Sequence, residues 1–89
     1  MNIREKQITV RTRKGVHGRI ATRMIKIANR HNVRLFIIYN GQHYDCSSVL
    51  DILSVALACG TTFILQIVGQ EPDRAMQAVE KLMSGRDDS

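Results

Sequence analysis

Hydrophobic residues recur along the chain with two different periods, and each change of period marks a new structural element. Apolar and polar residues alternate around Ile8 and Val10, which predicts a half-buried strand over residues 3–11. Over residues 18–31 the apolar positions instead follow the period of a helix with one buried face. The chain therefore begins with a strand and an amphipathic helix, separated by a break at Gly15.

The remaining sequence predicts a hairpin, two helices and a final strand. Residues 33–40 are rich in β-branched and aromatic side chains, and Asn40-Gly41 is typical of a type I′ turn leading into a return strand through Tyr44. The later elements are a helix over residues 49–57, a strand over 61–68, and a helix that begins at Pro72 and ends before Gly85. The order β-α-β-β-α-β-α predicts one α+β domain over residues 1–89, with helices on one face of an antiparallel or mixed sheet and a frayed tail at 86–89.

Composition excludes several classes of protein. The chain is 44% hydrophobic and 24% charged, with one Pro, so disordered and collagen-like proteins are disfavoured. It has neither a membrane-spanning apolar run nor the pattern of a signal peptide, and we expect a cytoplasmic protein without membrane insertion. Cys46 and Cys59 are far from any plausible ligand set, so we expect free buried thiols, no metal and no cofactor.

The net charge of +5 is unevenly distributed. Ten of the thirteen Lys and Arg residues lie in the first 34 positions, together with a single acid. Four of these cations follow a helical stripe within residues 18–31: Arg19, Arg23, Lys26 and Arg30. This asymmetry indicates an anionic partner for the N-terminal third, such as nucleic acid, phosphate or an acidic protein surface.

His17 stands immediately before the predicted first helix, where it has a possible chemical role. A helix N-terminus disfavours imidazolium and favours a bound anion, and neutral imidazole is a nucleophile. The amides near Gly18 and Arg19, together with the Arg19 guanidinium, could stabilise a phosphoryl group on the ring. The simpler interpretation is that His17 only caps the helix, and the pattern alone leaves both open.

A family resemblance enters at these residues. The segment Gly15-Val16-His17-Gly18-Arg19-Ile20-Ala21 resembles the Gly-Leu-His-Ala-Arg-Pro-Ala active-site segment of HPr, the histidine-containing phosphocarrier of the bacterial phosphoenolpyruvate:sugar phosphotransferase system. The likeness continues through Asn40-Gly41, Ser47-Ser48-Val49-Leu50, Ser54 and Gly60. It implies an open-faced β-sandwich, a four-stranded antiparallel sheet with three helices on one face. It also implies phosphoryl transfer from Enzyme I to His17, stabilised by Arg19, and onward to an Enzyme IIA-type acceptor.

Three positions depart from the family pattern. Ile20 stands where the family has a nearly fixed proline, Gly18 replaces alanine, and Lys14 occupies a position often held by asparagine. Glycine loosens the helix start, and Ile20 does not preset φ as proline would. Because His17 and Arg19 are both retained, we interpret the chain as a divergent carrier or a regulatory paralogue.

Ser48 resembles the serine that a dedicated HPr kinase phosphorylates in Gram-positive relatives. It also forms a capping-box pattern with Asp51, whose carboxylate would repel a phosphate, so we favour a structural N-cap. Val49, Leu50 and Leu53 correspond to the family's exposed apolar docking patch, although either leucine could instead belong to the core.

Three functions compete at this point. A phosphocarrier uses His17 as a nucleophile, whereas a nucleic-acid-binding module would use only the basic stripe. A regulatory adaptor would keep the fold and bind a transcription factor or an enzyme without sustained transfer. Nucleic-acid binding is the weakest of the three, because 4% aromatic content without tryptophan lacks the usual stacking residues. The basic stripe, Arg23 and Lys26 included, suits docking onto an acidic face of Enzyme I.

Strand alternation makes one further prediction, which concerns self-association. If Leu35 and Ile37 pack on the helices, the open face of the sheet carries Phe36, Ile38, Ile64 and Val68. A contiguous apolar patch there would favour a homodimer or a partner surface. The other interpretation is that these residues only satisfy strand propensity, and the two are evenly balanced.

Overall fold

A computed structural model describes residues 1–86 and places the elements in the predicted order. They are β1 (Asn2–Thr9), α1 (Gly18–His31), β2 (Arg34–Tyr39), β3 (Gln42–Asp45), α2 (Val49–Val55), β4 (Thr62–Gly69) and α3 (Pro72–Met83). The bounds of α1 coincide with those predicted from its apolar period, and Pro72 opens α3 as expected.

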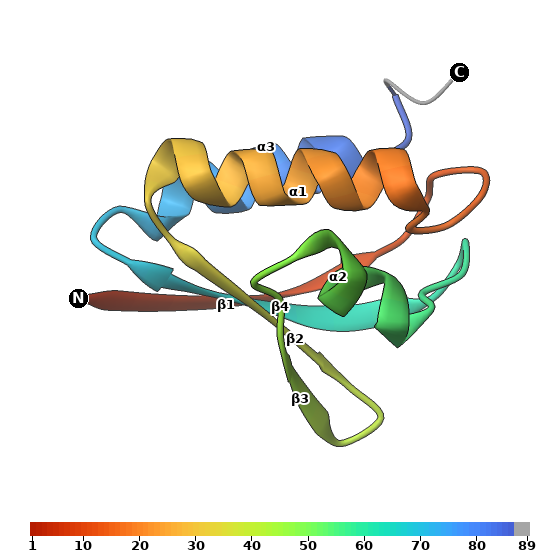
Figure 1. The fold of residues 1–89 in the computed structure, drawn as a ribbon, viewed down its shortest axis with the longest axis horizontal. Helices are drawn as coiled ribbons and strands as arrows, with labels where there is room; N and C mark the ends of the chain where they lie inside the picture. Colours follow the sequence, from red (N-terminus) through yellow and green to blue (C-terminus); the bar gives the residue numbers. More distant parts are fainter. Residues whose placement is uncertain (87–89) are drawn as a thin grey trace.

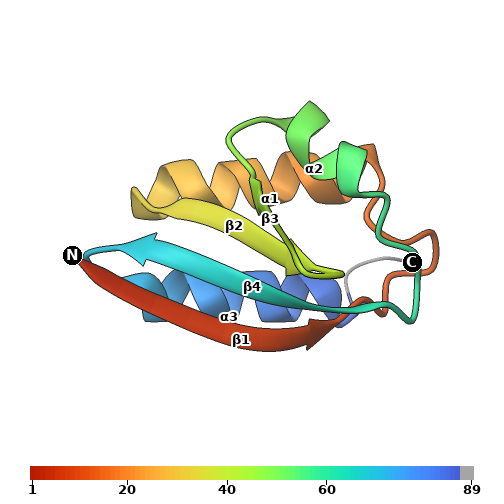
Figure 2. The same ribbon diagram turned by 90° about the horizontal axis from the view of Figure 1, so that it is seen from below.

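The four strands form one sheet in the spatial order β1-β4-β2-β3, and every pairing is antiparallel. β4, the last strand in sequence, lies between β1 and β2, so the sheet pairs the first strand of the chain with the last. Figures 1 and 2 show the helices on one side of this sheet, with α1 and α3 side by side and α2 next to α1. The expected four-stranded open-faced sandwich is confirmed.

The core lies between the sheet and the helices. In β2 the side chains of Leu35 and Ile37 are almost fully buried. The alternate residues of β4 join them: Phe63, Leu65 and Ile67. Met24 of α1 and Val79 of α3 are fully buried against this layer, so the period of two in the strands and the helical period of α1 and α3 point their apolar residues into one core.

Several predicted boundaries are wrong by one or two residues, for local reasons. β1 ends at Thr9, because the Val10 amide donates to the Thr61 carbonyl outside the strand ladder. β2 is shorter than predicted because Asn40 adopts positive φ in the hairpin turn. α2 ends at Val55 rather than near residue 57, because Ala56 takes the left-handed conformation that ends the helix.

The thiols follow the prediction only in part. Both cysteines are free, and burial raises the pKa of Cys46 to about 11. Cys59 is exposed, so the expectation of two buried thiols is wrong for this residue, which lies in the turn before β4. The frayed tail predicted at 86–89 lies mostly outside the described residues.

Within residues 1–86, no helix has the length and apolar character that crossing a membrane requires. The same residues contain no group of three or more potential metal ligands.

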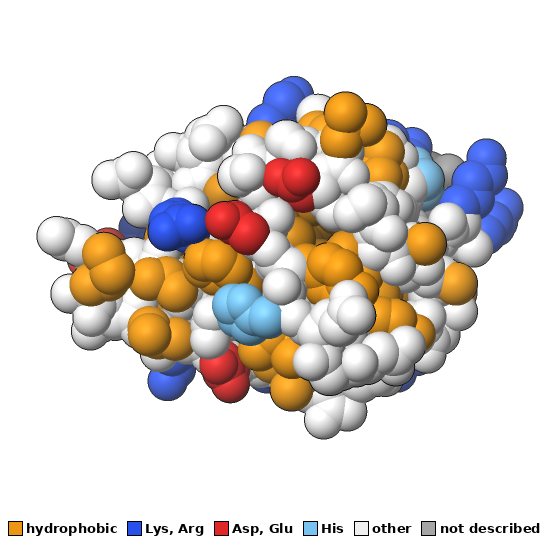
Figure 3. Space-filling model, turned by 60° about the horizontal axis from the view of Figure 1, so that its bottom comes forward, with side chains coloured by type: hydrophobic (Ala, Val, Ile, Leu, Met, Phe, Trp, Pro, Cys, Tyr) orange, Lys and Arg blue, Asp and Glu red, His pale blue; other side chains and the backbone are white. Residues whose placement is uncertain are grey.

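The open face of the sheet carries the predicted apolar residues, but polar side chains divide them. Phe36, Ile38 and Val68 are partly buried there, and Ile64 is 37% exposed. Figure 3 views the molecule with this side brought forward and shows hydrophobic patches separated by charged and histidine side chains. The placement of the four residues is therefore confirmed, whereas their use in a dimer stays a prediction.

A hydrogen-bonded row crosses that face from the outer strand to the hairpin. The Gln66 amide donates to Glu5 Oε2 at 2.6 Å, and its carbonyl oxygen lies 3.1 Å from His43 Nε2. The carbonyl can only accept, so His43 donates from Nε2. The His43 ring also stacks on Phe36, with centroids 5.1 Å apart. These polar side chains therefore have partners within the chain.

Candidate functional site

His17 is the N-cap of α1. Its backbone is extended, with φ −93° and ψ −175°, and its carbonyl accepts the first helical hydrogen bond from Ala21 at 2.9 Å. The amides of Gly18 and Ile20 precede that bond, at the positive end of the helix dipole. No acidic residue lies in the first turn. The imidazole is half-buried, and its Nε2 atom is shielded from solvent.

The loop that carries His17 is held by a buried threonine. Thr12 is fully buried, and its hydroxyl donates to the Gly15 carbonyl at 2.7 Å. The Gly15 amide returns a hydrogen bond of 3.0 Å to the Thr12 carbonyl. This reciprocal pair closes a tight turn just before the histidine, a role that nothing in the sequence pattern had indicated.

A second contact clamps the same loop onto the chain that follows α2. The Val16 amide donates to the Leu57 carbonyl at 2.9 Å. Gly15 lies against the same carbonyl with φ +72°, and a Cβ added there would stand 2.5 Å from that oxygen. Only glycine fits this conformation and this space together.

Ile20 and Gly18, which depart from the family pattern at the start of α1, have different surroundings. Ile20 is fully buried, so this side chain anchors the first turn of α1 in the core. Gly18 is exposed, and a Cβ added there would meet no atom within 4 Å. Neither residue therefore obstructs the space around His17, and Gly18 makes no contact that requires a glycine.

The predicted basic residues lie along α1. Each of the four is exposed: Arg19, Arg23, Lys26 and Arg30. His17, Gly18 and Arg19 come together at the start of the helix, as consecutive residues must. The other two histidines lie elsewhere, His31 at the opposite end of α1 and His43 on the sheet.

Ser48 and Asp51 form the predicted capping box. The Ser48 hydroxyl accepts from the Asp51 amide at 3.2 Å, and Asp51 Oδ2 accepts from the Ser48 amide at 3.0 Å. The Ser47 hydroxyl also donates to this carboxylate at 2.9 Å. Hydrogen bonds from the Ser47 and Ser48 side chains hold the pKa of Asp51 below its usual range. The structural role of Ser48 as an N-cap is confirmed.

The apolar residues of α2 divide between core and surface. Leu50 is 77% exposed, whereas Val49 and Leu53 are partly buried and pack against the core. α2 lies beside α1 in both views of the ribbon (Figures 1 and 2), so Leu50 extends from an element next to the helix that carries the cations. Of the three predicted docking residues, Leu50 is the most accessible.

Comparison with known protein families assigns this fold to a class, that of the phosphocarriers of the phosphotransferase system. The chain belongs to the family described as PTS HPr component phosphorylation site, whose model matches residues 4–85.

Individual relatives agree with this membership. The chain is 31% identical to the HPr-like protein Crh of Halalkalibacterium halodurans, over 84% of this chain and 89% of the relative. It is 29% identical to the phosphocarrier protein NPr of Shewanella violacea, over 94% and 92%. The crystal structure of HPr from Bacillus anthracis shares the fold with a TM-score of 0.82 at 23% identity, covering 93% of this chain and 99% of that one.

Replacing Gly15 by alanine tests the clamp. We expect Gly15→Ala to lower the free energy of unfolding by about 1–3 kcal/mol, because alanine is strained at this φ and meets the Leu57 carbonyl. Gly18→Ala is the matched control and should raise it by about 0.4–1 kcal/mol, since the added methyl group has open space. Urea denaturation measures both. A Gly15→Ala variant as stable as the wild type would contradict the clamp.

Proposed function

We propose that this chain is a cytoplasmic phosphocarrier that accepts a phosphoryl group on His17 from Enzyme I and passes it to an Enzyme IIA-type acceptor. The observation that carries the proposal is the position of His17, the N-cap of α1 on a clamped loop in a chain of the HPr family. The proposal needs no cofactor and no metal.

The burial of Nε2 selects the reacting atom. Because Nε2 is shielded from solvent, we assign the reaction to Nδ1, the other ring nitrogen. In the tautomer with its proton on Nε2, Nδ1 keeps a lone pair that attacks phosphorus. The new N–P bond forms as the donor's bond to phosphorus breaks, and the bonding electrons return to the donor. Transfer to the acceptor repeats the same step in reverse.

The start of α1 supplies stabilisation for the transferred group. Its first amides and the Arg19 guanidinium are donors suited to phosphoryl oxygens, and the glycine at Gly18 adds no side chain in front of the ring. Ile20 has an amide N–H where the family has proline, so this helix start has one more donor than the family pattern provides. Positioning and electrostatics together account for most catalysis of phosphoryl transfer.

Partner docking is assigned to the surface beside His17. The exposed cations Arg23 and Lys26 attract an acidic protein face, and the exposed Leu50 fills an apolar depression in it. Val49 and Leu53 contribute their accessible edges. Charge steers the encounter, whereas the apolar contacts hold the complex.

The proposed role for Ser48 is that of the helix cap. Phosphorylation by an HPr kinase would remove the Ser48–Asp51 hydrogen bond and place a phosphate beside the carboxylate. Neither a regulatory adaptor nor a nucleic-acid-binding module explains why a histidine stands at the start of α1, and both are therefore set aside in favour of the carrier.

His17 is expected to be the sole phosphoryl acceptor. Incubation with phosphoenolpyruvate and Enzyme I should give one acid-labile phosphate by mass spectrometry, and His17→Ala should abolish it. His31→Ala and His43→Ala are the matched controls and should keep it, because neither residue lies at a helix N-terminus. Labelling that persists in His17→Ala would refute the mechanism.

Arg19 is expected to act on the rate and not on the fold. Arg19→Ala should slow transfer roughly tenfold or more, since it removes one donor to the phosphoryl group. Its free energy of unfolding should change by no more than about 0.5 kcal/mol, because the side chain is exposed. An unchanged transfer rate would remove Arg19 from the site.

Charge reversal on α1 tests the docking surface. Arg23→Glu with Lys26→Glu should lower the association rate with Enzyme I by roughly tenfold at low salt, and less at high salt. Arg11→Glu with Arg74→Glu changes the net charge equally at exposed positions outside α1 and is the control. Equal loss in both pairs, measured by stopped-flow, would show a general charge effect instead of docking.

Self-association through the open sheet face is the remaining partner prediction. Phe36→Lys and Ile64→Lys each place a charge among the four residues of the patch and should dissociate a dimer formed there. Sedimentation of the wild type beside the two variants measures this. A wild type that is monomeric at high concentration refutes homodimerisation through the face.

A further inference from the structure

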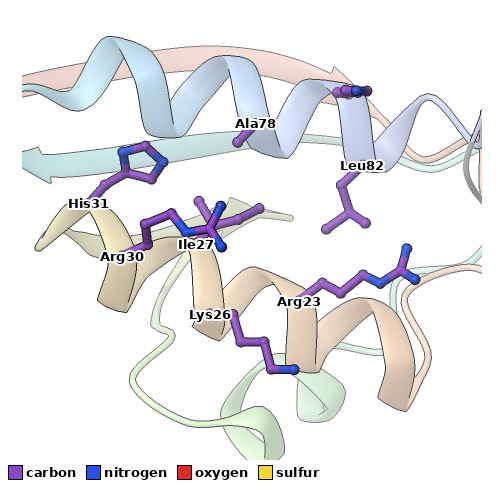
Figure 4. Close-up of a pocket in the computed structure, with 8 residues that line it drawn as sticks. Arg23, Lys26, Ile27, Arg30, His31, Ala78 and Leu82 are labelled. Atoms are coloured by element: carbon purple, nitrogen blue, oxygen red, sulfur yellow. The ribbon is translucent and has the colours of Figure 1, made fainter.

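A groove of about 300 Å³ lies between α1 and α3, on molecular surface that the phosphocarrier proposal does not use as a ligand site. Its apolar floor consists of Ile27, Ala78 and Leu82, and its cationic rim of Arg23, Lys26, Arg30 and Lys81. Figure 4 shows Arg23 and Arg30 alongside the space between the helices, with Leu82 pointing from α3 toward α1. We call this the α1–α3 groove.

The charge of the groove has one sign. Every ionisable residue that lines it is basic or histidine. Within residues 1–86, no ion pair with a carboxylate is formed by Arg23, Arg30 or Lys81.

The acids of α3 are engaged elsewhere. Asp73 pairs with Arg4 at 2.6 Å and Glu80 pairs with Lys6 at 2.8 Å, which directs both carboxylates toward β1. Four cations therefore line the groove without a neutralising side chain from the described residues of either helix.

We propose that the α1–α3 groove binds a small organic phosphate with at least two negative charges, of the nucleoside diphosphate class. Guanidinium groups bind phosphate oxygens in pairs, and Arg23 and Arg30 stand about 10 Å apart along α1 by helical rise. Lys81 faces them from α3, so a diphosphate can contact both helices. The apolar floor accommodates the uncharged part of the ligand.

The size of the groove favours a small molecule over a macromolecule. A volume of about 300 Å³ is at the lower end of the range for small-ligand sites.

The inference goes beyond the proposed function and does not need phosphoryl transfer to be correct. The two surfaces share Arg23 and Lys26, because these residues also belong to the docking surface. A ligand in the groove would neutralise Arg23 and slow the encounter with an acidic partner. Ligand binding in the groove would then change the rate of docking without a contact to His17.

Titration of the full chain with ADP, pyrophosphate and adenosine, followed by backbone amide NMR, tests the site. We expect saturable shifts in residues 23–31 and 78–82 with ADP, weaker binding of pyrophosphate, and none of adenosine. Pyrophosphate binding as tightly as ADP would overturn the assignment of an organic ligand. Shifts centred on residues 17–19 would overturn the groove itself.

Matched variants separate a site from general charge attraction. Arg30→Gln with Lys81→Gln should weaken ADP binding by roughly tenfold, whereas Arg11→Gln with Arg74→Gln, which removes the same net charge, should leave it unchanged. Ala78→Leu fills the floor without changing charge and should also weaken binding. Equal weakening by both charge pairs overturns the proposal.

Two further measurements separate a failure of the groove proposal from a failure of the phosphocarrier proposal. His17 labelling by Enzyme I should persist in the Arg30→Gln, Lys81→Gln variant, since neither residue belongs to the transfer site. A failure of labelling in the wild type would therefore refute the phosphocarrier and leave the groove standing. Binding of a short DNA duplex that displaces ADP from the same residues would overturn the small-molecule ligand in favour of nucleic acid.

Discussion

The carbonyl of Leu57 accepts the Val16 amide at 2.9 Å and closes the space beside Gly15, and the position of His17 depends on both contacts. The loop before α1 would otherwise be a short solvent-exposed segment, free to adopt many conformations. The clamp turns it into a rigid support, because Leu57 is itself buried in the core. This rigidity suits the proposed transfer through His17, because little ordering of the loop remains to be done when a protein partner binds.

The same contact depends on the early end of α2. Ala56 leaves the helical conformation one residue before Leu57, so the Leu57 carbonyl is available to the loop instead of to a longer helix. A helix of seven residues is marginal by itself, and the capping box of Ser48 and Asp51 supplies local stabilisation at its start. The clamp and the cap thus hold α2 beside α1, where Leu50 is presented to solvent.

Local sequence patterns predicted the helices and strands. They did not predict the side-chain contacts that the tertiary structure creates. The apolar period gave the bounds of α1, and the alternation in β2 and β4 placed the right side chains in the core. Thr12 carries no such signal, because neither apolar period identifies a buried hydroxyl that bonds a backbone carbonyl three residues away, and the Val16–Leu57 contact beside it joins segments about forty residues apart. The hydrogen-bonded row from Glu5 through Gln66 to His43 could not be predicted from local patterns either, because its three residues lie on three different strands. The role of His17 required the family resemblance, since a histidine at this position equally fits a simple cap.

The basic stripe of α1 illustrates how a single sequence feature can serve two surfaces. Helical periodicity places Arg23, Lys26 and Arg30 within one arc, yet α1 has α2 on one side and α3 on the other. Figure 4 shows Lys26 extending away from α3, while Arg23 and Arg30 lie along the space facing it. All three cations line the α1–α3 groove, and Arg23 and Lys26 also belong to the proposed docking surface. In the two proposals, a ligand bound at Arg23 and Lys26 would lower the positive charge that the docking surface presents to an acidic partner.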